Sequence, residues 1–138
     1  MELAPAGKGE GLTQSSILVV EDEILIRLHL AEELRAAGYV VVEATDSREA
    51  MTVLTSRDDI GLVLTDIRMP GNFDGVALGR WIRTKFPEVK IVLVSAELYA
   101  ENFMEFDGGF TKPVRVNELV RRVRQLLPQA EHGDSRSR

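Results

Sequence analysis

The sequence contains no cysteine, and this absence excludes a disulfide scaffold and a thiolate metal site. It also contains no apolar run close to the roughly 20 residues that a membrane-spanning helix needs. Residues 1–14 are rich in Gly and Ala but lack an apolar core, so they do not form a secretory signal. These absences are compatible with a cytoplasmic protein without membrane contact, which is the location that we expect.

An excess of basic residues is missing as well. The chain carries 17 Lys and Arg against 22 Asp and Glu, and its formal net charge is -5. Binding to nucleic acid phosphates needs a basic surface, so we expect no direct nucleic-acid binding. With 138 residues, 44% of them hydrophobic, the chain is typical of one globular domain of ordinary size.

From residue 15 onward, short apolar runs alternate with stretches of helical spacing. This alternation is typical of successive βαβ units and a parallel sheet. We expect strands at 17–20, 39–43, 61–65, 90–94 and 110–111. We expect helices from 25 to about 38, after a cap at Asp46, at 74–85, weakly within 96–108, and between Pro113 and Pro128. The predicted fold is α/β, with a doubly wound sheet of five parallel strands and helices on both faces.

The two ends of the chain lie outside this alternating pattern. We expect a flexible N-terminal extension over 1–14, one domain over 15–128 and a polar C-terminal tail over 129–138. Within these residues we expect no DNA-binding or enzymatic effector domain after the last helix, so a stand-alone domain is the natural interpretation.

Polar side chains stand where four of the predicted strands end. They are Glu21, Asp22 and Glu23 after the first strand, Asp66 after the third, Ser95 after the fourth and Lys112 after the fifth. Ligands of doubly wound sheets bind outside the carboxyl ends of the strands, so these side chains are expected to converge on one cleft. Carboxylates held close together repel one another, and an all-oxygen site with access to water suits Mg²⁺. A nearby hydroxyl and ammonium would suit a phosphoryl group.

Each of these residues also has an ordinary interpretation when it is taken alone. An acid after a strand is commonly a helix cap, a serine there is commonly a turn residue, and a lysine is commonly solvated. Their joint placement at successive strand ends favours a site. By contrast, His29 is expected to be a surface or packing residue, and Arg121, Arg122 and Arg124 are expected to form the solvated side of an amphipathic helix.

Over about Ser15 to Pro128 the chain resembles a receiver domain of a two-component response regulator. Four motifs carry the resemblance, each at the end of its predicted strand: Val19-Val20-Glu21-Asp22-Glu23, Thr65-Asp66-Ile67-Arg68-Met69-Pro70 with Asp74-Gly75 after it, Val94-Ser95-Ala96, and Thr111-Lys112-Pro113. The resemblance implies a flavodoxin-like sheet with strand order 2-1-3-4-5. It also implies a cis peptide bond before Pro113.

The resemblance further implies a role for each site residue. Asp66 would accept a phosphoryl group from a sensor histidine kinase or a histidine phosphotransfer protein. Glu21, Asp22, Asp66 and the backbone carbonyl of Arg68 would hold Mg²⁺, and Ser95 and Lys112 would contact the phosphoryl oxygens. The output would be a change of partner, without turnover of a separate substrate, as in a stand-alone receiver or a phosphorelay shuttle. Arg68 and Glu97 are expected to flank the cleft and to tune how fast water reaches the acyl phosphate.

The segment before Lys112 departs from the family pattern. Receivers usually carry Tyr or Phe three residues before the lysine, where this chain has Gly109. The adjacent Phe110 points to the opposite side of the strand and cannot replace that aromatic. The segment is also short, so we expect a short or irregular fourth helix, with three candidates for signal coupling: Tyr99, Phe103 and Phe106.

Other functions fit the sequence less well. A flavodoxin-like cofactor binder needs a Gly-rich phosphate loop after the first strand, where this chain has acids. A phosphatase with an aspartate nucleophile needs a second acid two residues later, and Arg68 occupies that position. The alternative that stays open is a degenerate receiver that acts as a phosphorylation-independent docking module, because its switch region is altered.

Overall fold

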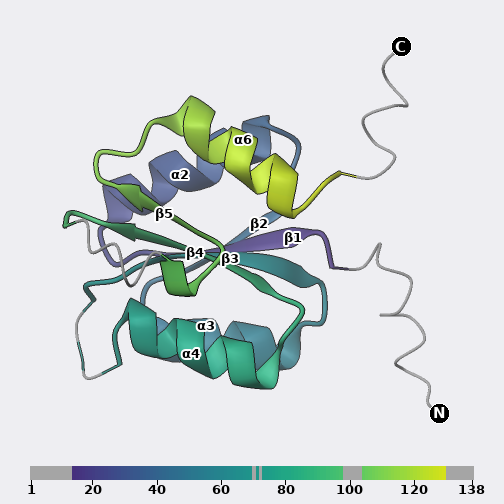
Figure 1. Ribbon diagram of the computed structural model, residues 1–138, viewed down its shortest axis with the longest axis vertical. Coiled ribbons are helices and arrows are strands. Elements are labelled where there is room, and N and C mark those ends of the chain that lie inside the picture. Colours follow the sequence, from purple (N-terminus) through teal and green to yellow (C-terminus); the bar gives the residue numbers. More distant parts are fainter. Residues whose placement is uncertain (1–13, 70, 72, 98–103, 130–138) are drawn as a thin grey trace.

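The computed structural model describes residues 14–69, 71, 73–97 and 104–129 (Figure 1). Its strands are β1 (Ser16–Val20), β2 (Val41–Ala44), β3 (Ile60–Asp66), β4 (Lys90–Ser95) and β5 (Gly108–Thr111). Its helices are α2 (Ile24–Ala36), α3 (Ser47–Ser56), α4 (Gly75–Lys85) and α6 (Val116–Leu126). The expected extension over 1–14 and the expected tail over 129–138 lie almost wholly outside the described residues.

The five strands form one parallel sheet in the order β2-β1-β3-β4-β5. Helices α2 and α6 cover one face of the sheet, and α3 and α4 cover the other (Figure 1). The predicted fold class, strand order and two-sided helical cover are therefore confirmed. No helix among the described residues is long and apolar enough to cross a bilayer.

Two strands begin two residues away from the predicted start, whereas the other strand ends differ from the prediction by at most one residue. Strand β2 begins at Val41 instead of Tyr39, because the Tyr39 backbone N–H donates to the Leu34 carbonyl of α2 at 3.2 Å and is not available for the sheet. The buried Tyr39 hydroxyl donates a hydrogen bond of 2.7 Å to the Leu127 carbonyl. Strand β5 begins at Gly108 instead of Phe110, because Gly108 and Gly109 already pair with β4. Residues 98–103 of the expected fourth helix lie outside the described residues.

Local signals explain where the helices begin and end. The Asp46 and Asp74 carboxylates accept hydrogen bonds of 2.9 Å from the backbone N–H groups of Glu49 and Ala77, and so cap α3 and α4. Gly38 follows α2 with a φ of 105°, a backbone conformation that glycine adopts without strain. Arg115 precedes α6 and makes no side-chain capping bond.

The hydrophobic core has one layer on each side of the sheet, and β1 contributes to both. Its side chains alternate between the layers, as a strand requires. The layer under α2 and α6 includes Ile17, Val19, Leu34, Leu119 and Val123. The layer under α3 and α4 includes Leu18, Val20, Leu78, Ile82 and Phe106. Because β1 and β3 are buried along their whole length, the polar groups at their carboxyl ends are held by a rigid frame.

Candidate functional site

Three buried polar side chains meet at the carboxyl edge of the sheet. Glu21 follows β1, Asp66 ends β3 and Ser95 ends β4, and each is at most 6% exposed. The parallel register places Val20 beside Thr65 and Asp66 beside Val94, so these strands end at one level. The structure thus brings together the polar strand ends that the sequence pointed to.

Glu21, Asp22 and Asp66 form an acidic cluster. One carboxylate oxygen from each lies within 4.8 Å of the others. Glu21 and Asp66 are buried, whereas Asp22 is exposed and gives the cluster an opening to solvent. A set of hard oxygen donors with access to water can hold a metal ion, and its chemistry fits a divalent cation such as Mg²⁺.

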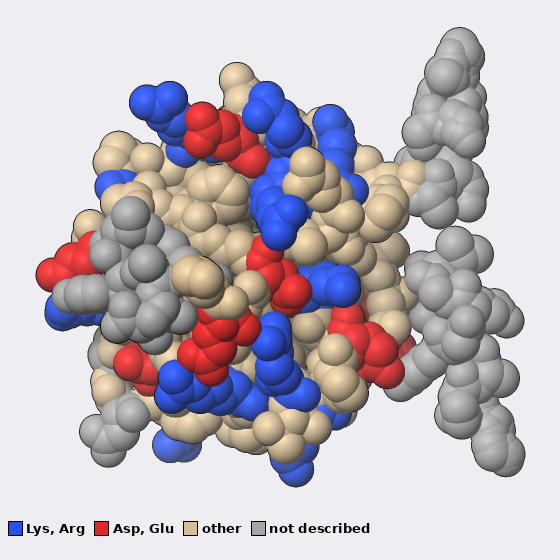
Figure 2. Space-filling view, viewed as in Figure 1, with Lys and Arg blue, Asp and Glu red and all other residues tan. Residues whose placement is uncertain are grey.

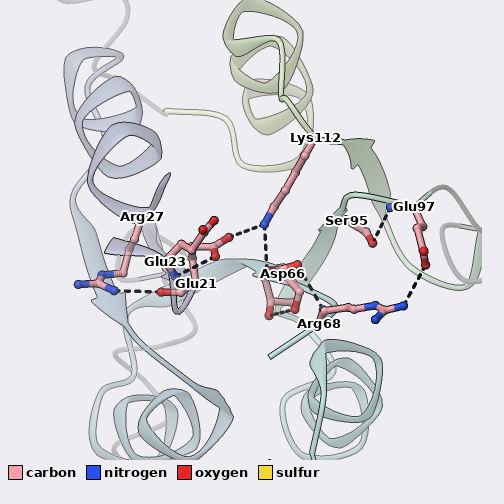
Figure 3. Close-up of polar contacts among 9 residues, drawn as sticks. Glu21, Glu23, Arg27, Asp66, Arg68, Ser95, Glu97 and Lys112 are labelled. Carbon is pink, nitrogen blue, oxygen red and sulfur yellow. Dashed lines mark hydrogen bonds and ion pairs between the residues drawn. The ribbon is translucent and has the colours of Figure 1, made fainter. Parts of the chain in front are cut away.

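Lys112 bridges the two buried acids of this cluster (Figure 3). Its Nζ lies 3.0 Å from Glu21 Oε1 and 2.9 Å from Asp66 Oδ2. Its backbone N–H donates a hydrogen bond of 2.8 Å to the Ser95 carbonyl, which anchors the lysine to the end of β4. The Lys112-Pro113 peptide bond is cis, as expected. The ammonium group is therefore held over the carboxylate that ends β3.

The charges in this cluster are coupled. Burial raises the pKa of the Glu21 carboxyl, and the nearby Asp66 charge adds to the rise, although hydrogen bonds from the Glu23 N–H and from Lys112 oppose it. Burial disfavours the charged form of Lys112, but its hydrogen bonds to Asp66 and Glu21 outweigh this effect, so the pKa of Lys112 lies above its usual value. Negative charge is thus in excess here, which favours binding of a cation.

A second polar pair lies beside the cluster, at the loops that follow β3 and β4. Arg68 Nη2 contacts Glu97 Oε1 at 3.1 Å, and both side chains are largely exposed (Figure 3). The Arg68 backbone N–H donates to Asp66 Oδ1 at 3.3 Å, and the Glu97 N–H donates to the Ser95 hydroxyl at 3.2 Å. The backbone of each residue in the pair is therefore hydrogen-bonded to a buried residue at the carboxyl edge of the sheet.

Two residues that support the site, Gly75 and Arg27, were not identified from the sequence. A Cβ atom built on Gly75 would overlap the backbone oxygen of Asp66, so only glycine allows α4 to approach this strand end. The Asp74-Gly75 pair in the motif was the available signal. Arg27 donates a hydrogen bond of 3.0 Å to the Glu21 carbonyl, and nothing in the sequence pattern distinguished it from a solvated arginine.

The remaining polar residues near the site do not join it. The Glu23 side chain lies outside the acidic cluster, and its residue precedes α2 without a side-chain capping bond. His29 is exposed on α2, in agreement with its expected surface position. Lys and Arg are intermixed with Asp and Glu over the described part of the face in Figure 2, so this face has no continuous basic area.

A family model for the response regulator receiver domain matches residues 17–124. Among curated proteins, the chain is 36% identical over 115 residues to the aerobic respiration control protein ArcA of Escherichia coli strain K12, covering 80% of this chain and 48% of ArcA. It is 29% identical to the sensor kinase CckA of Brucella abortus, covering 85% of this chain and 13% of that protein. The chain spans about half the length of ArcA and of the phosphate regulon transcriptional regulatory protein PhoB of Pseudomonas aeruginosa.

Solved structures of similar fold are also described as response regulators or receiver domains. The response regulator protein TrrA from Thermotoga maritima, in complex with Mg(2+)-BeF, is 35% identical with a TM-score of 0.73, over 82% of this chain and 99% of TrrA. The receiver domain of NtrX from Brucella abortus is 29% identical with a TM-score of 0.75, over 81% of this chain and 98% of that domain. The chain therefore belongs to the response regulator receiver domain family of two-component systems.

Proposed function

We propose that this protein receives a phosphoryl group on Asp66 from a sensor histidine kinase or a histidine phosphotransfer protein, and that phosphorylation changes its binding partner. One observation carries the proposal: the buried Asp66 carboxylate at the end of β3 contacts the Lys112 ammonium and lies in the acidic cluster. In this cluster one carboxylate oxygen of Asp66 is within 4.8 Å of carboxylate oxygens of Glu21 and Asp22. A nucleophile, a fixed cation and a set of metal donors thus occupy one small volume. A cytoplasmic location is part of this proposal.

The donor chemistry of the cluster fits Mg²⁺, which would be held by carboxylates of Glu21, Asp22 and Asp66 and by the backbone carbonyl of Arg68. When bound, the ion would neutralise charge on the phosphoryl oxygens. The solved structure of the similar TrrA in complex with Mg(2+)-BeF supports this assignment. The buried Glu21 has a raised pKa, so a cation would also relieve the repulsion within the cluster.

The proposed reaction uses side chains that are already in place. An Asp66 carboxylate oxygen attacks the phosphorus atom of the donor's phosphohistidine, the P–N bond breaks, and its electron pair returns to the imidazole. Lys112 stays bonded to Asp66 and offsets the charge of the transferred group. The Ser95 hydroxyl, at the end of the neighbouring strand, donates a hydrogen bond to a phosphoryl oxygen. The product is an acyl phosphate on the protein itself, so no separate substrate is turned over.

Intact-mass spectrometry of the full chain after incubation with a small acyl phosphate donor and Mg²⁺ tests the proposal. We expect a mass increase of one phosphoryl group that disappears in Asp66→Asn. Asp58→Asn is a matched control, because Asp58 is an exposed aspartate outside the cluster, and this variant should be modified like the wild type. An unmodified wild-type protein would contradict the proposal and favour a phosphorylation-independent docking module.

A further inference from the structure

Arg27 connects the acidic loop after β1 to the neighbouring strand β2. It lies in the first turn of α2, and its side chain is 13% exposed. Its Nη1 donates a hydrogen bond of 3.0 Å to the backbone carbonyl of Glu21, and its Nε contacts Glu43 Oε1 at 3.1 Å (Figure 3 shows the bond to Glu21). One guanidinium group thus holds the main chain of a cluster residue from outside the cluster.

Glu43 is itself fixed, so Arg27 has a rigid anchor. Glu43 lies in β2, where it pairs with Val19 of β1, and its side chain is 22% exposed. Its second oxygen, Oε2, contacts Arg35 Nη1 at 3.2 Å, and Arg35 also donates to the Val41 carbonyl at 2.8 Å. Glu43 thus anchors both arginines, and of the two, Arg27 is the one that hydrogen-bonds the Glu21 carbonyl.

Glu21 depends on this support because α2 has no side-chain cap to order the loop before it. The Glu21 backbone N–H donates to the Ala44 carbonyl at 3.0 Å, and its Oε2 accepts a bond of 3.0 Å from the Glu23 N–H. Its Oε1 contacts Lys112. The Glu21 carbonyl is the remaining polar group, and Arg27 is the donor that the structure gives it. The peptide that joins Glu21 to Asp22 is therefore oriented by Arg27.

We propose that Arg27 is a positioning residue for the divalent-cation site, and that it sets the affinity of the site by fixing the Glu21-Asp22 peptide. This inference rests on the proposed function, which places the ion on Glu21, Asp22 and Asp66. Without the bond from Arg27, carboxylates that repel one another can move apart by rotation of this peptide. Groups outside the ligand set that orient metal ligands typically change affinity about 10–100-fold when they are removed.

The rival interpretation is that Arg27 only ties α2 to β2. Stability and metal affinity separate the two interpretations. A tie between elements contributes to the free energy of unfolding in the absence of metal but leaves the metal affinity of the folded protein unchanged. Arg35 offers a matched control on the same helix, because it contacts Glu43 but does not contact Glu21.

The test measures the binding of Mn²⁺ to the full chain. Mn²⁺ is a suitable probe because carboxylate sites for Mg²⁺ also bind Mn²⁺. Binding is detected as a loss of the electron paramagnetic resonance signal of free Mn²⁺. We expect the Kd to rise about tenfold or more in Arg27→Gln, whose side chain is too short to reach both partners. We expect Arg27→Lys, which keeps a single donor nitrogen, to show an intermediate rise, and Arg35→Gln to bind Mn²⁺ within about twofold of the wild type. Phosphorylation of Arg27→Gln should return towards the wild-type rate at saturating Mg²⁺.

Circular dichroism first verifies that each variant is folded, and Arg27→Lys carries the test if Arg27→Gln is not. Equal Kd values for the wild type and the folded Arg27 variants, together with a lower free energy of unfolding, would overturn the proposal and leave Arg27 as a tie between elements. Wild-type protein that binds no Mn²⁺ would contradict the metal site itself and, with it, this role for Arg27.

Discussion

Lys112 and Asp66 lie 46 positions apart in the sequence and are joined by a hydrogen bond of 2.9 Å between Nζ and Oδ2. The same ammonium contacts Glu21 at 3.0 Å, so one cation serves two buried acids. Both carboxylates thus have a cationic partner before any phosphoryl group arrives. This arrangement also means that the charge that would offset the phosphoryl group is already oriented.

We expect Lys112→Met to destabilise the metal-free protein by about 2–3 kcal/mol, because Glu21 and Asp66 would then be buried without their cation. Mg²⁺ should restore part of this loss by supplying positive charge to the same carboxylates. Urea unfolding with and without Mg²⁺ measures both effects. Lys85→Met, at an exposed position on α4, is the control and should change stability by less than about 0.5 kcal/mol. Equal stability of the two variants would show that the bridge has no energetic role.

Alanine variants of two glycines in α4 should separate a role in supporting the site from a role in general packing. In Gly75→Ala the new Cβ would overlap the Asp66 backbone oxygen, so this strand end must shift, and both stability and phosphorylation rate should fall. In Gly79→Ala the Cβ would lie 2.9 Å from the Phe106 ring. This overpacking should lower the free energy of unfolding by about 1–3 kcal/mol, and the higher helix propensity of alanine should offset about 1 kcal/mol of that loss. Phosphorylation should be nearly unchanged in this second variant. Urea unfolding and initial phosphorylation rates provide the comparison, and equal phosphorylation rates would contradict the role given to Gly75.

The Arg68–Glu97 pair should control access of water to the acyl phosphate. Both side chains are exposed, so breaking the pair costs at most about 1 kcal/mol of stability. We expect Arg68→Ala and Glu97→Ala each to speed dephosphorylation a few-fold, measured as decay of the phosphorylated mass after removal of the donor. Arg80→Ala removes an exposed arginine paired with Glu105 on α4 and should leave the decay rate unchanged. Unchanged decay in the Arg68 and Glu97 variants, with phosphorylation intact, would refute this role.

Acid stability should depend on Asp59, away from the site. Two hydrogen bonds from Arg57 and one from the Ser16 hydroxyl lower the pKa of the Asp59 carboxyl to about 2 from its usual 3.8. A lowered pKa in the folded state contributes stability that is present above the usual value and is lost as the pH falls from about 4 towards 2. Allowing for partial exposure, this contribution is about 1–2 kcal/mol.

Urea unfolding between about pH 2.5 and 6 tests the role of Asp59, with the pH range set by the two pKa values. The stability of Asp59→Asn should fall less steeply with acid than that of the wild type, and its deficit should be largest above pH 4. Asp58→Asn, at the exposed neighbouring position, should follow the wild-type curve. Parallel curves for the wild type and Asp59→Asn would exclude this contribution.

The fold and the convergence of the polar strand ends could be read from the sequence because both follow from periodicity. Apolar runs that end in acids determine where Glu21 and Asp66 lie, and a parallel sheet brings such ends to one edge. The start of β2 could not be read, because the Tyr39 backbone N–H bonds to the Leu34 carbonyl of α2, and its hydroxyl bonds to a carbonyl 88 positions away. The roles of Gly75 and Arg27 were hidden for a different reason: each acts through a backbone oxygen, of Asp66 and of Glu21 respectively, and no side-chain pattern records such a contact.

The aromatic residues near β5 were only partly predictable. Phe110 packs against the core layer under α2 and α6, whereas Phe106 is buried in the layer under α3 and α4. The Phe106 ring also lies 5.1 Å from the Arg83 guanidinium carbon. Alternation along a strand was enough to assign Phe110 to the side opposite that of position 109. Phe106 precedes the strand, so its place on the other face depends on the path of the loop and not on periodicity. Of the three candidate couplers, Tyr99 and Phe103 lie outside the described residues.

The central claim, that Asp66 carries the phosphoryl group, is tested most directly by locating the modification. Borohydride reduces an aspartyl phosphate to homoserine, which tandem mass spectrometry of the digested protein can assign to one position. We predict homoserine at position 66 after treatment with a phosphodonor and Mg²⁺, and its absence when the divalent cation is chelated. Homoserine at another aspartate, or none in a folded and Mg²⁺-bound protein, would contradict the account.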